Sequence, residues 1–380
     1  MKAPDERGGV AAAALALVVV IGTLAGAAIF EAADADRYYR SVQEDEALEW
    51  ATFWAFLGAA ALNLGVAFRA SRRGVRIPWF PVGVALFCIF VAMEEISWGQ
   101  RVLGYRPPAY FLEENYQQEL NLHNVFSTSL RKGVLKAVIL GYGVALPLLA
   151  RVPTGGRLLS RAGGGAPPLS LAPAFLATWL AYEWYPWSHT GEWVELTLGL
   201  GFLFAVLPAT ETANAPSKSR SRAGRAAAWV ALATGGVWAL GAAGAAASRL
   251  QRSASPEILE AARAEVEMLR RDFLEKRVRT SCGLHKRLYT FVEQYDADAL
   301  LAGRFVALTE RGLPEERAAY FLDPWNSPYW IRDRCERREQ RRSVFVYSFG
   351  PNRVRDSTHF EIREDDVGAY LRRRPRGDEE

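Results

Sequence analysis

Seven carboxylate and imidazole side chains lie within or beside apolar segments of the sequence, where they could carry out acid–base or metal chemistry. The first two close an apolar run that ends in MEEISWGQR, and the others follow in NLHN and in YEWYPWSHTGEWVE. A charged side chain within a membrane costs roughly 2.5–3.5 kcal/mol on insertion scales, so such residues usually face a cavity and have a partner. The set comprises Glu94, Glu95, His123, Glu183, His189, Glu192 and Glu195.

Two kinds of chemistry fit these residue types. Carboxylates and imidazoles together bind divalent metals, which activate water or polarise a carbonyl. Acids close to one another raise each other's pKa, which suits general acid–base catalysis or a proton relay. The predicted metal ligands are His123, His189, Glu192 and Glu195, and the catalytic candidates, without assigned roles, are Glu94, Glu95, His123 and Glu183.

A purely structural interpretation of these residues stays open. Acids at the edge of a membrane can be solvated, and a glutamate near a helix start, such as Glu192, complements the helix dipole. Tryptophans such as Trp98 and Trp193 are expected as interfacial anchors. The sequence contains no H-E-x-x-H motif, which would have been a specific metal signal.

Seven apolar segments are long enough to place these residues at the ends of membrane helices, since a spanning helix needs roughly 20 mostly apolar residues. The first is longer than a signal-peptide core and precedes further spans, so we interpret it as an uncleaved helix. Whether both the fifth and the sixth segments span stays open, because only SHTG separates them. The segments are 9–30, 50–69, 79–97, 133–150, 170–187, 192–208 and 226–247.

Loop charges predict the orientation of these helices. Arginine and lysine gather in 69–77, 151–168 and 210–225, and these loops alternate with the acidic stretch 31–49 and the long loop 98–132. Basic loops stay on the cytoplasmic side. We therefore expect a multi-pass protein of the bacterial plasma (inner) membrane, with a cytoplasmic N-terminus and an extracytoplasmic C-terminal domain. The basic stretch RKGVLK, at a predicted outer end, does not fit this pattern.

The chain changes character near residue 250, from apolar runs to charged sequence. The net charge is only +4 and the basic residues follow the membrane topology, so we expect the lipid bilayer and no nucleic acid as partner. Cys88 lies in an apolar run and fits a packing role, whereas Cys282 and Cys335 lie in the polar part. These two could form a disulfide if that part faces an oxidising compartment.

The charged C-terminal part predicts a helix on a small sheet. Ser255 and Pro256 form a helix start, and an apolar stripe at three-to-four spacing runs from Leu259 to Phe273, so the helix is expected to end near 278. DPWNSPYWIRD and RRSVFVYSFGPN predict two short strands. The fold class is thus a polytopic α-helical membrane protein with a C-terminal α+β domain, divided as 1–225 (six spans), 226–254 (seventh span and linker) and 255–380.

LDPWNSPYW, VFVYSFGPN and the closing DDV resemble the C-terminal domain of the major pseudopilin of type II secretion, the G-type, over about residues 226–370. The resemblance implies a long helix on an antiparallel sheet, envelope or secretion-system proteins as partners, and calcium bound by the last loops. Carried over, the calcium ligands are Ser348, Asp356, Asp365 and Asp366. Asn352, where that family tends to have Asp, and the internal position of the seventh span depart from the family pattern. The membrane half resembles uncharacterised multi-pass bacterial membrane proteins.

Three functional hypotheses follow from these observations. The first is binding or scaffolding at the cell envelope by the pseudopilin-like domain. The second is an intramembrane metal-dependent hydrolase or transferase acting on a lipid substrate through the outer glutamates and histidines. The third is an ion-coupled transporter or sensor that uses the same acids. The sequence leaves open whether the chain is an enzyme.

Overall fold

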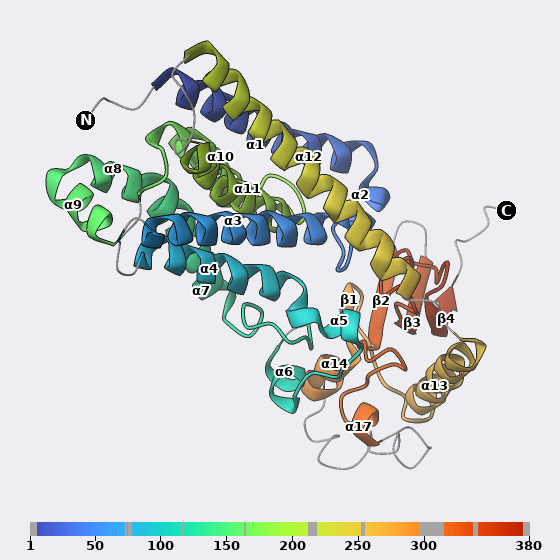
Figure 1. Cartoon of the computed structure of the whole chain (residues 1–380). Coiled ribbons are helices and arrows are strands. Elements are labelled where there is room, and N and C mark those ends of the chain that lie inside the picture. The colour runs from blue at the N-terminus through green and yellow to red at the C-terminus, as the bar shows by residue number, and fades with distance from the viewer. Residues whose placement is uncertain are drawn as a thin grey trace. The chain divides into compact units, whose positions relative to one another are not determined.

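The computed structural model of the chain describes residues 6–72, 74, 78–115, 117–162, 165–211, 219–251, 255–295, 315–336 and 341–374 (Figure 1). These residues form two compact units. The helical unit comprises Met1–Gly99 and Asn121–Ala247, and the C-terminal unit comprises Gln100–Leu120 and Ser248–Glu380.

The helical unit consists of helices, several of them long and apolar. Its elements are α1 (Glu6–Ala33), α2 (Ala35–Ser41), α3 (Ala47–Arg72), α4 (Trp79–Glu95), α7 (Thr128–Leu140), a π-helical turn (Gly141–Ala145), α8 (Leu146–Arg151), α9 (Pro153–Arg161), α10 (Ala172–Trp184), α11 (Thr190–Glu211) and α12 (Ser219–Gln251).

Among the described residues, five helical segments are long and apolar enough to cross a membrane: Val10–Ala33, Ala47–Arg72, Thr128–Arg151, Thr190–Leu207 and Gly224–Leu250. A sixth candidate is α4 together with Ser97–Leu103, which are bent by 66° against each other. The predicted span 170–187 corresponds to α10, whose 13 residues fall short of the roughly 20 that a membrane crossing needs. The basic loops 69–77, 151–168 and 210–225, which predicted the orientation, lie partly outside the described residues.

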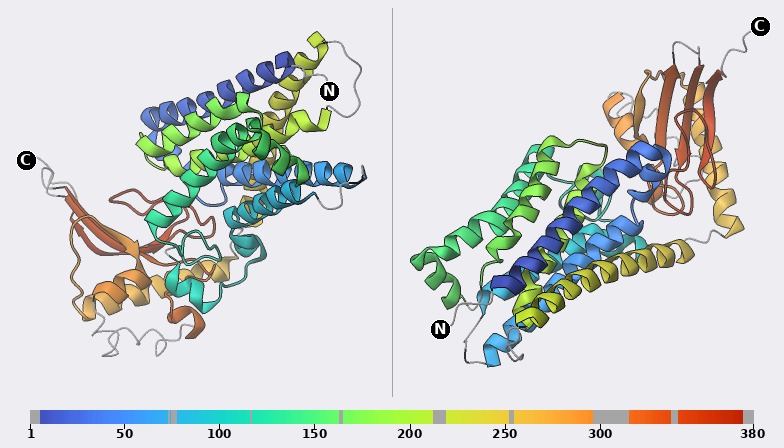
Figure 2. Two further views of the ribbon diagram at one scale, coloured as in Figure 1. Left: turned by 90° about the vertical axis from the view of Figure 1, so that its left-hand side faces the viewer. Right: turned by 90° about the horizontal axis from the view of Figure 1, so that it is seen from above.

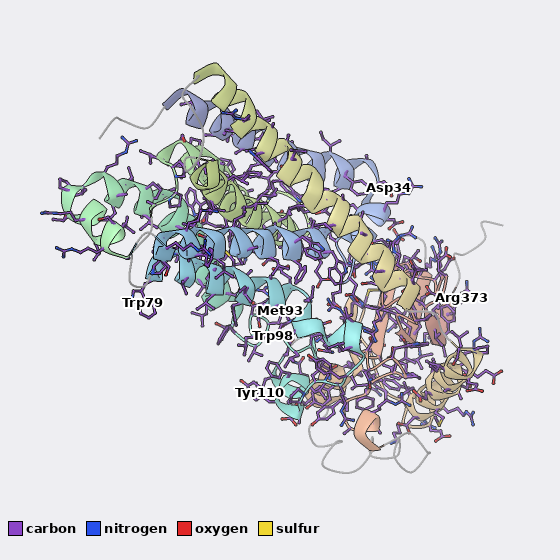
Figure 3. The ribbon with its side chains drawn as sticks, in the orientation of Figure 1. Asp34, Trp79, Met93, Trp98, Tyr110 and Arg373 are labelled. Carbon is purple, nitrogen blue, oxygen red and sulfur yellow. A yellow bond between two sulfur atoms is a disulfide. The ribbon has the colours of Figure 1, made fainter. Side chains whose placement is uncertain are left out.

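Small residues let these helices approach one another closely. Ala51, Ala55 and Ala59 on α3 are fully buried, and a side-chain carbon on Gly241 of α12 would lie 2.7 Å from the carbonyl oxygen of Ala47. Small contact residues are typical of helices that associate in membranes. Trp79 begins α4 and Trp98 lies just beyond its end (Figure 3), and both side chains are exposed. Trp193, also expected as an interfacial anchor, is instead buried and donates a 3.1 Å hydrogen bond to the Tyr38 hydroxyl.

The C-terminal unit is a four-stranded antiparallel sheet with one long helix against it (Figure 2). The helix α13 (Pro256–Glu275) begins as predicted, with the Ser255 hydroxyl accepting a hydrogen bond from the Ile258 N–H at 3.3 Å, and ends three residues before 278. Its stripe packs on the sheet through Ala262, Val266, Leu269 and Phe273. The strands follow chain order: β1 (Leu284–Arg287), β2 (Trp330–Glu336), β3 (Arg341–Ser348) and β4 (Val367–Arg374).

Sequence analysis predicted β2 and β3 but not the edge strands. β1 is only four residues long, and it pairs with β2 from Leu284 opposite Asp333 to Arg287 opposite Trp330. β4 has the alternation Val367, Ala369 and Leu371, but it follows a run of acids that obscured it. The described residues of this part also include the short helices α14 (Leu288–Tyr295) and α17 (Glu315–Ala318).

The segment 100–120, predicted to be a plain outer loop, is part of the C-terminal unit. It contains α5 (Gln100–Leu103) and α6 (Ala109–Glu114). The Tyr320 hydroxyl donates to the Glu113 carboxylate at 3.0 Å, and the Arg353 guanidinium donates to the Arg101 carbonyl at 3.3 Å. The C-terminal unit is therefore assembled from two stretches of chain rather than from 255–380 alone.

Candidate functional site

The candidate site lies in the helical unit where α4 ends. Ser97, Trp98 and Gly99 follow the helix with φ angles of 46°, 55° and 77°. Left-handed conformations at two successive non-glycine residues are costly and persist only when their surroundings impose them. The Trp98 indole N–H donates to Glu94 Oε1 at 2.7 Å and thereby holds this turn against the helix.

Glu94 also fixes the NLHN stretch. Its second oxygen, Oε2, accepts hydrogen bonds from the backbone N–H groups of Leu122 (2.7 Å) and His123 (3.0 Å), and lies 3.3 Å from His123 Nδ1. Asn121 adds a bond from its side-chain amide to the Ser97 hydroxyl at 3.1 Å. MEEISWGQR and NLHN thus form two sides of one hydrogen-bonded structure. Glu94 is 3% exposed and its oxygens are engaged, so we assign it a positioning role.

Glu95 belongs to a second group of acids, which we call the Glu95 cluster: Glu49, Glu95, Glu192 and Glu195. Glu95 interacts electrostatically with the other three carboxylates, which come from α3 and α11. Glu192 is exposed, and the other three are partly exposed. Sequence analysis missed Glu49, although the acidic stretch EDEALEW at the start of α3 was a signal for it.

His123 and Arg131 lie beside the cluster. His123 and Arg131 interact electrostatically with Glu192, and Arg131 also interacts with Glu195. Arg131 is oriented by its 2.8 Å hydrogen bond to the Asn124 side chain. Sequence analysis had noted Arg131 only as a misfit in the charge pattern.

The two lysines of RKGVLK, Lys132 and Lys136, make local contacts. Lys136 forms a 2.5 Å ion pair with Glu183, and Lys132 lies 5.7 Å from the centre of the Tyr185 ring. These contacts give a physical reason for basic residues at this end of α7. Glu183, a catalytic candidate, is therefore engaged in an ion pair.

The predicted metal ligands are brought together only in part. His123, Glu192 and Glu195 belong to one region, whereas the His189 ring packs edge-on against Tyr39 with centroids 5.3 Å apart. Among the described residues, no group of three or more His, Cys, Asp or Glu is arranged to hold a metal ion. Metal binding by His123, His189, Glu192 and Glu195 stays a prediction.

The predicted calcium loop is held by hydrogen bonds among its own residues. The Asn352 amide N–H₂ donates to Asp356 (2.7 Å) and Asp365 (2.6 Å), while its oxygen accepts from the Val354 N–H (2.7 Å). The Val354 donor fixes the orientation of this amide. An amide donor thus bridges the two carboxylates that a cation would otherwise bridge.

The other two predicted calcium ligands have separate partners. Ser348 is fully buried and its hydroxyl donates to the Asp323 carboxylate. Asp366 accepts a 2.8 Å hydrogen bond from the Ser357 N–H, and burial raises the pKa of Asp366 to about 7. Burial, with a contribution from neighbouring Asp356, raises the pKa of Asp365 to about 6. Calcium binding stays a prediction.

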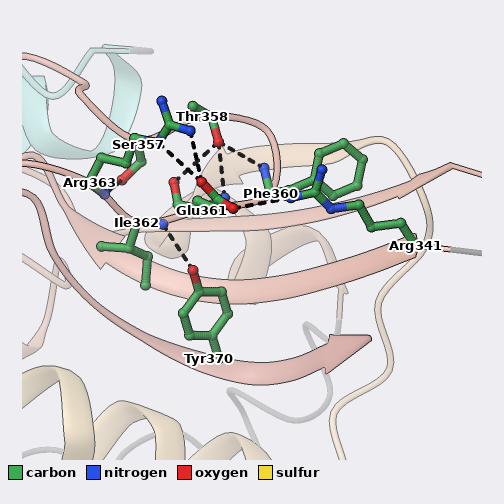
Figure 4. Close-up of polar contacts among 8 residues, drawn as sticks. All are labelled: Arg341, Ser357, Thr358, Phe360, Glu361, Ile362, Arg363 and Tyr370. Carbon is green, nitrogen blue, oxygen red and sulfur yellow. Dashed lines mark hydrogen bonds and ion pairs between the residues drawn. The ribbon is translucent and has the colours of Figure 1, made fainter. Parts of the chain in front are cut away.

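The turn after this loop is tied to the sheet (Figure 4). The Ile362 N–H donates to the Tyr370 hydroxyl at 3.0 Å, and the Glu361 carboxylate pairs with Arg341 at 3.3 Å and Arg363 at 2.8 Å. These arginines lower the pKa of Glu361. The ion-paired side chains are partly exposed, so these ion pairs contribute little to stability.

Cys282 and Cys335 are joined in a disulfide, with their Cα atoms 5.5 Å apart. The bond links the residues just before β1 to the end of β2, and Cys88 stays a free, buried thiol. Sequence analysis had made this pairing conditional on an oxidising compartment.

No protein-family model, no curated protein and no solved structure matches this chain. The resemblance of the C-terminal part to the major pseudopilin therefore stays a prediction from its motifs.

Proposed function

We propose that the chain is an integral membrane protein whose helical unit exchanges protons and a cation at the Glu95 cluster, as ion-coupled transporters and sensors do. The observation that carries the proposal is the convergence of four carboxylates from three helices beside Arg131 and His123. Neighbouring carboxylates repel one another when ionised, and acids at membrane depth need a neutralising partner. Arg131 supplies positive charge beside Glu192 and Glu195, and protons or a bound cation would offset the repulsion among the carboxylates.

Different glutamates of the site are suited to different roles. Glu94 is fully engaged in holding the loop that carries His123, so it is unsuited to binding an ion. Glu192 is exposed and can meet water and solutes. Binding of a cation at the Glu95 cluster would then displace protons from these carboxylates.

The test is proton release on addition of a cation. Purified full-length protein in detergent, with a pH dye and little buffer, is titrated with sodium, potassium, magnesium, calcium and zinc salts. We expect one of these ions to release protons, and Glu95→Gln to abolish most of the release. Glu183→Gln is the matched control, because it removes a carboxylate that pairs with Lys136 outside the cluster.

Two outcomes would contradict the proposal. Absence of proton release for every ion between about pH 5 and pH 9 would leave the cluster as a structural feature. Release by zinc alone, lost in His123→Ala but kept in Glu95→Gln, would instead favour the metal-dependent hydrolase or transferase.

A second candidate function, binding or scaffolding at the cell envelope, is supported by the C-terminal unit. Its disulfide is of the kind that persists in oxidising compartments, in agreement with the predicted extracytoplasmic location. Crosslinking in cells from an exposed position such as Arg334 on β2 tests it. Specific adducts with an envelope protein from this position, absent when the same crosslinker is placed at the exposed Arg37 of α2, support scaffolding. No adduct from Arg334, or the same adducts from both positions, contradicts it.

A further inference from the structure

The short helix α9 combines exposed arginines with exposed apolar residues. Arg157 and Arg161 lie one helical turn apart and are exposed, as is Arg151 at the end of α8. None of the three forms an ion pair with any residue that the structure describes. Leu158 beside them is 65% exposed, and Val152 is 49% exposed.

The position of α9 is fixed by close packing on α8. A side-chain carbon on Gly155 would lie 2.2 Å from the Leu149 carbonyl oxygen, so only glycine lets α9 fold back this tightly. Leu159, one turn from Gly155, is buried. The far end of α9 is held by a 2.9 Å hydrogen bond from the Phe80 N–H to the Ala162 carbonyl, next to the exposed Trp79.

The apolar surface beside α9 continues into a candidate membrane helix. The segment Thr128–Arg151, which ends in α8, is the least buried of the candidate spans, and Leu148 and Leu149 are exposed at its end. An exposed apolar span that ends in a folded-back helix with arginines has the composition of an interfacial helix. Its leucines fit the acyl chains and its arginines fit the headgroups.

We infer that α9 lies in the membrane interface and that Arg151, Arg157 and Arg161 bind anionic phospholipid headgroups. The argument is charge complementarity: each arginine near an anionic surface contributes attraction, and a guanidinium makes paired hydrogen bonds to phosphate. The inference is independent of the Glu95 cluster. It gives the basic loop 151–168 a ligand in addition to its topological role.

The test uses full-length protein in nanodiscs, labelled with a fluorophore at Leu158→Cys. Cys88 is buried and the other two cysteines are bonded to each other, so the new thiol reacts selectively. Quenching by brominated phosphatidylglycerol and brominated phosphatidylcholine gives the relative affinity of the two lipids. We expect a preference for phosphatidylglycerol that falls roughly fivefold for each arginine replaced by glutamine and weakens in high salt.

A label at Ser160→Cys and the variant Arg37→Gln are the controls. Ser160 is exposed beside Leu158 but polar, so its label should be quenched less. Arg37, exposed in α2, should leave the lipid preference unchanged. If neither lipid quenched either label, α9 would lie outside the membrane interface. An unchanged lipid preference in the triple variant Arg151→Gln, Arg157→Gln, Arg161→Gln, with its melting temperature preserved, would overturn headgroup binding.

Discussion

At the residue scale, Glu94 determines the path of two segments. It is buried and accepts hydrogen bonds from an indole and from two backbone N–H groups. A glutamine would turn one of these oxygens into a donor that faces other donors. Such buried, unsatisfied groups cost about 1–3 kcal/mol each, and more when the lost partner was charged.

We therefore expect Glu94→Gln to destabilise the turn by about 3 kcal/mol. Hydrogen exchange of the Leu122 and His123 amides measures this directly, and these amides should exchange much faster in the variant. Glu183→Gln, which breaks a partly exposed ion pair, should change stability by less than about 1 kcal/mol. Unchanged protection of both amides in Glu94→Gln would show that Glu94 does not hold the turn.

Asn352 is the residue that decides the chemistry of the predicted calcium loop. In Asn352→Asp the bridging donor becomes a third carboxylate beside Asp356 and Asp365. We expect calcium affinity to rise on the order of tenfold, because affinity follows the number of charged ligands. Isothermal titration calorimetry with calcium checks this, and Asp356→Asn in the same background should reverse the gain. Equal affinity of wild type and variant would place any calcium site elsewhere.

His285 makes the stability of the C-terminal unit depend on pH. Its ring stacks on Trp330, with centroids 4.8 Å apart, and shares a 3.0 Å hydrogen bond with the Tyr347 hydroxyl. Burial, together with nearby Arg332 and Arg355, lowers the pKa of His285 to about 3. Because the folded pKa lies below the unfolded value near 6.5, its stabilising contribution is complete above pH 6.5 and is lost as pH falls toward 3.

Replacing His285 with phenylalanine removes this titration and keeps an aromatic ring on Trp330. From pH 7 to pH 5 we expect the free energy of unfolding of the wild type to fall by about 2 kcal/mol more than that of His285→Phe. The aspartates with raised pKa values are common to both proteins, so their contribution cancels in this comparison. Urea unfolding of the full chain, with hydrogen exchange of the β1 amides as the readout, measures the difference. Parallel pH profiles for the two proteins would contradict the assignment.

At the element scale, the disulfide holds the short strand β1 against β2. It closes a loop with a sequence separation of 53 residues. By loop-closure entropy, Cys282→Ser with Cys335→Ser should lower the free energy of unfolding of the C-terminal unit by about 4 kcal/mol. Thermal unfolding with and without reductant checks this: reductant should lower the transition of the wild type and leave that of the double variant unchanged.

At the scale of the whole molecule, the C-terminal unit draws on residues 100–120, far from it in sequence. The buried ion pair between Arg101 and Glu119, at 2.7 Å, holds the two ends of this segment together. Replacing α6 with a short glycine–serine linker should lower the unfolding transition of the C-terminal unit and leave the helices unaffected. A fragment 255–380 that is as stable alone as in the full chain would contradict this.

The sequence by itself determined the apolar helices, the start of α13 and the strands β2 and β3, because length, apolar spacing and capping residues act within one segment. It also identified Glu94, Glu95, His123, Glu192 and Glu195 as unusual. It did not show that Glu94 holds NLHN, that Glu49 joins the Glu95 cluster, or that 100–120 belongs to the C-terminal unit. These features depend on side chains from separate segments meeting in space, and that meeting is decided by helix packing and by the left-handed turn at Ser97, Trp98 and Gly99.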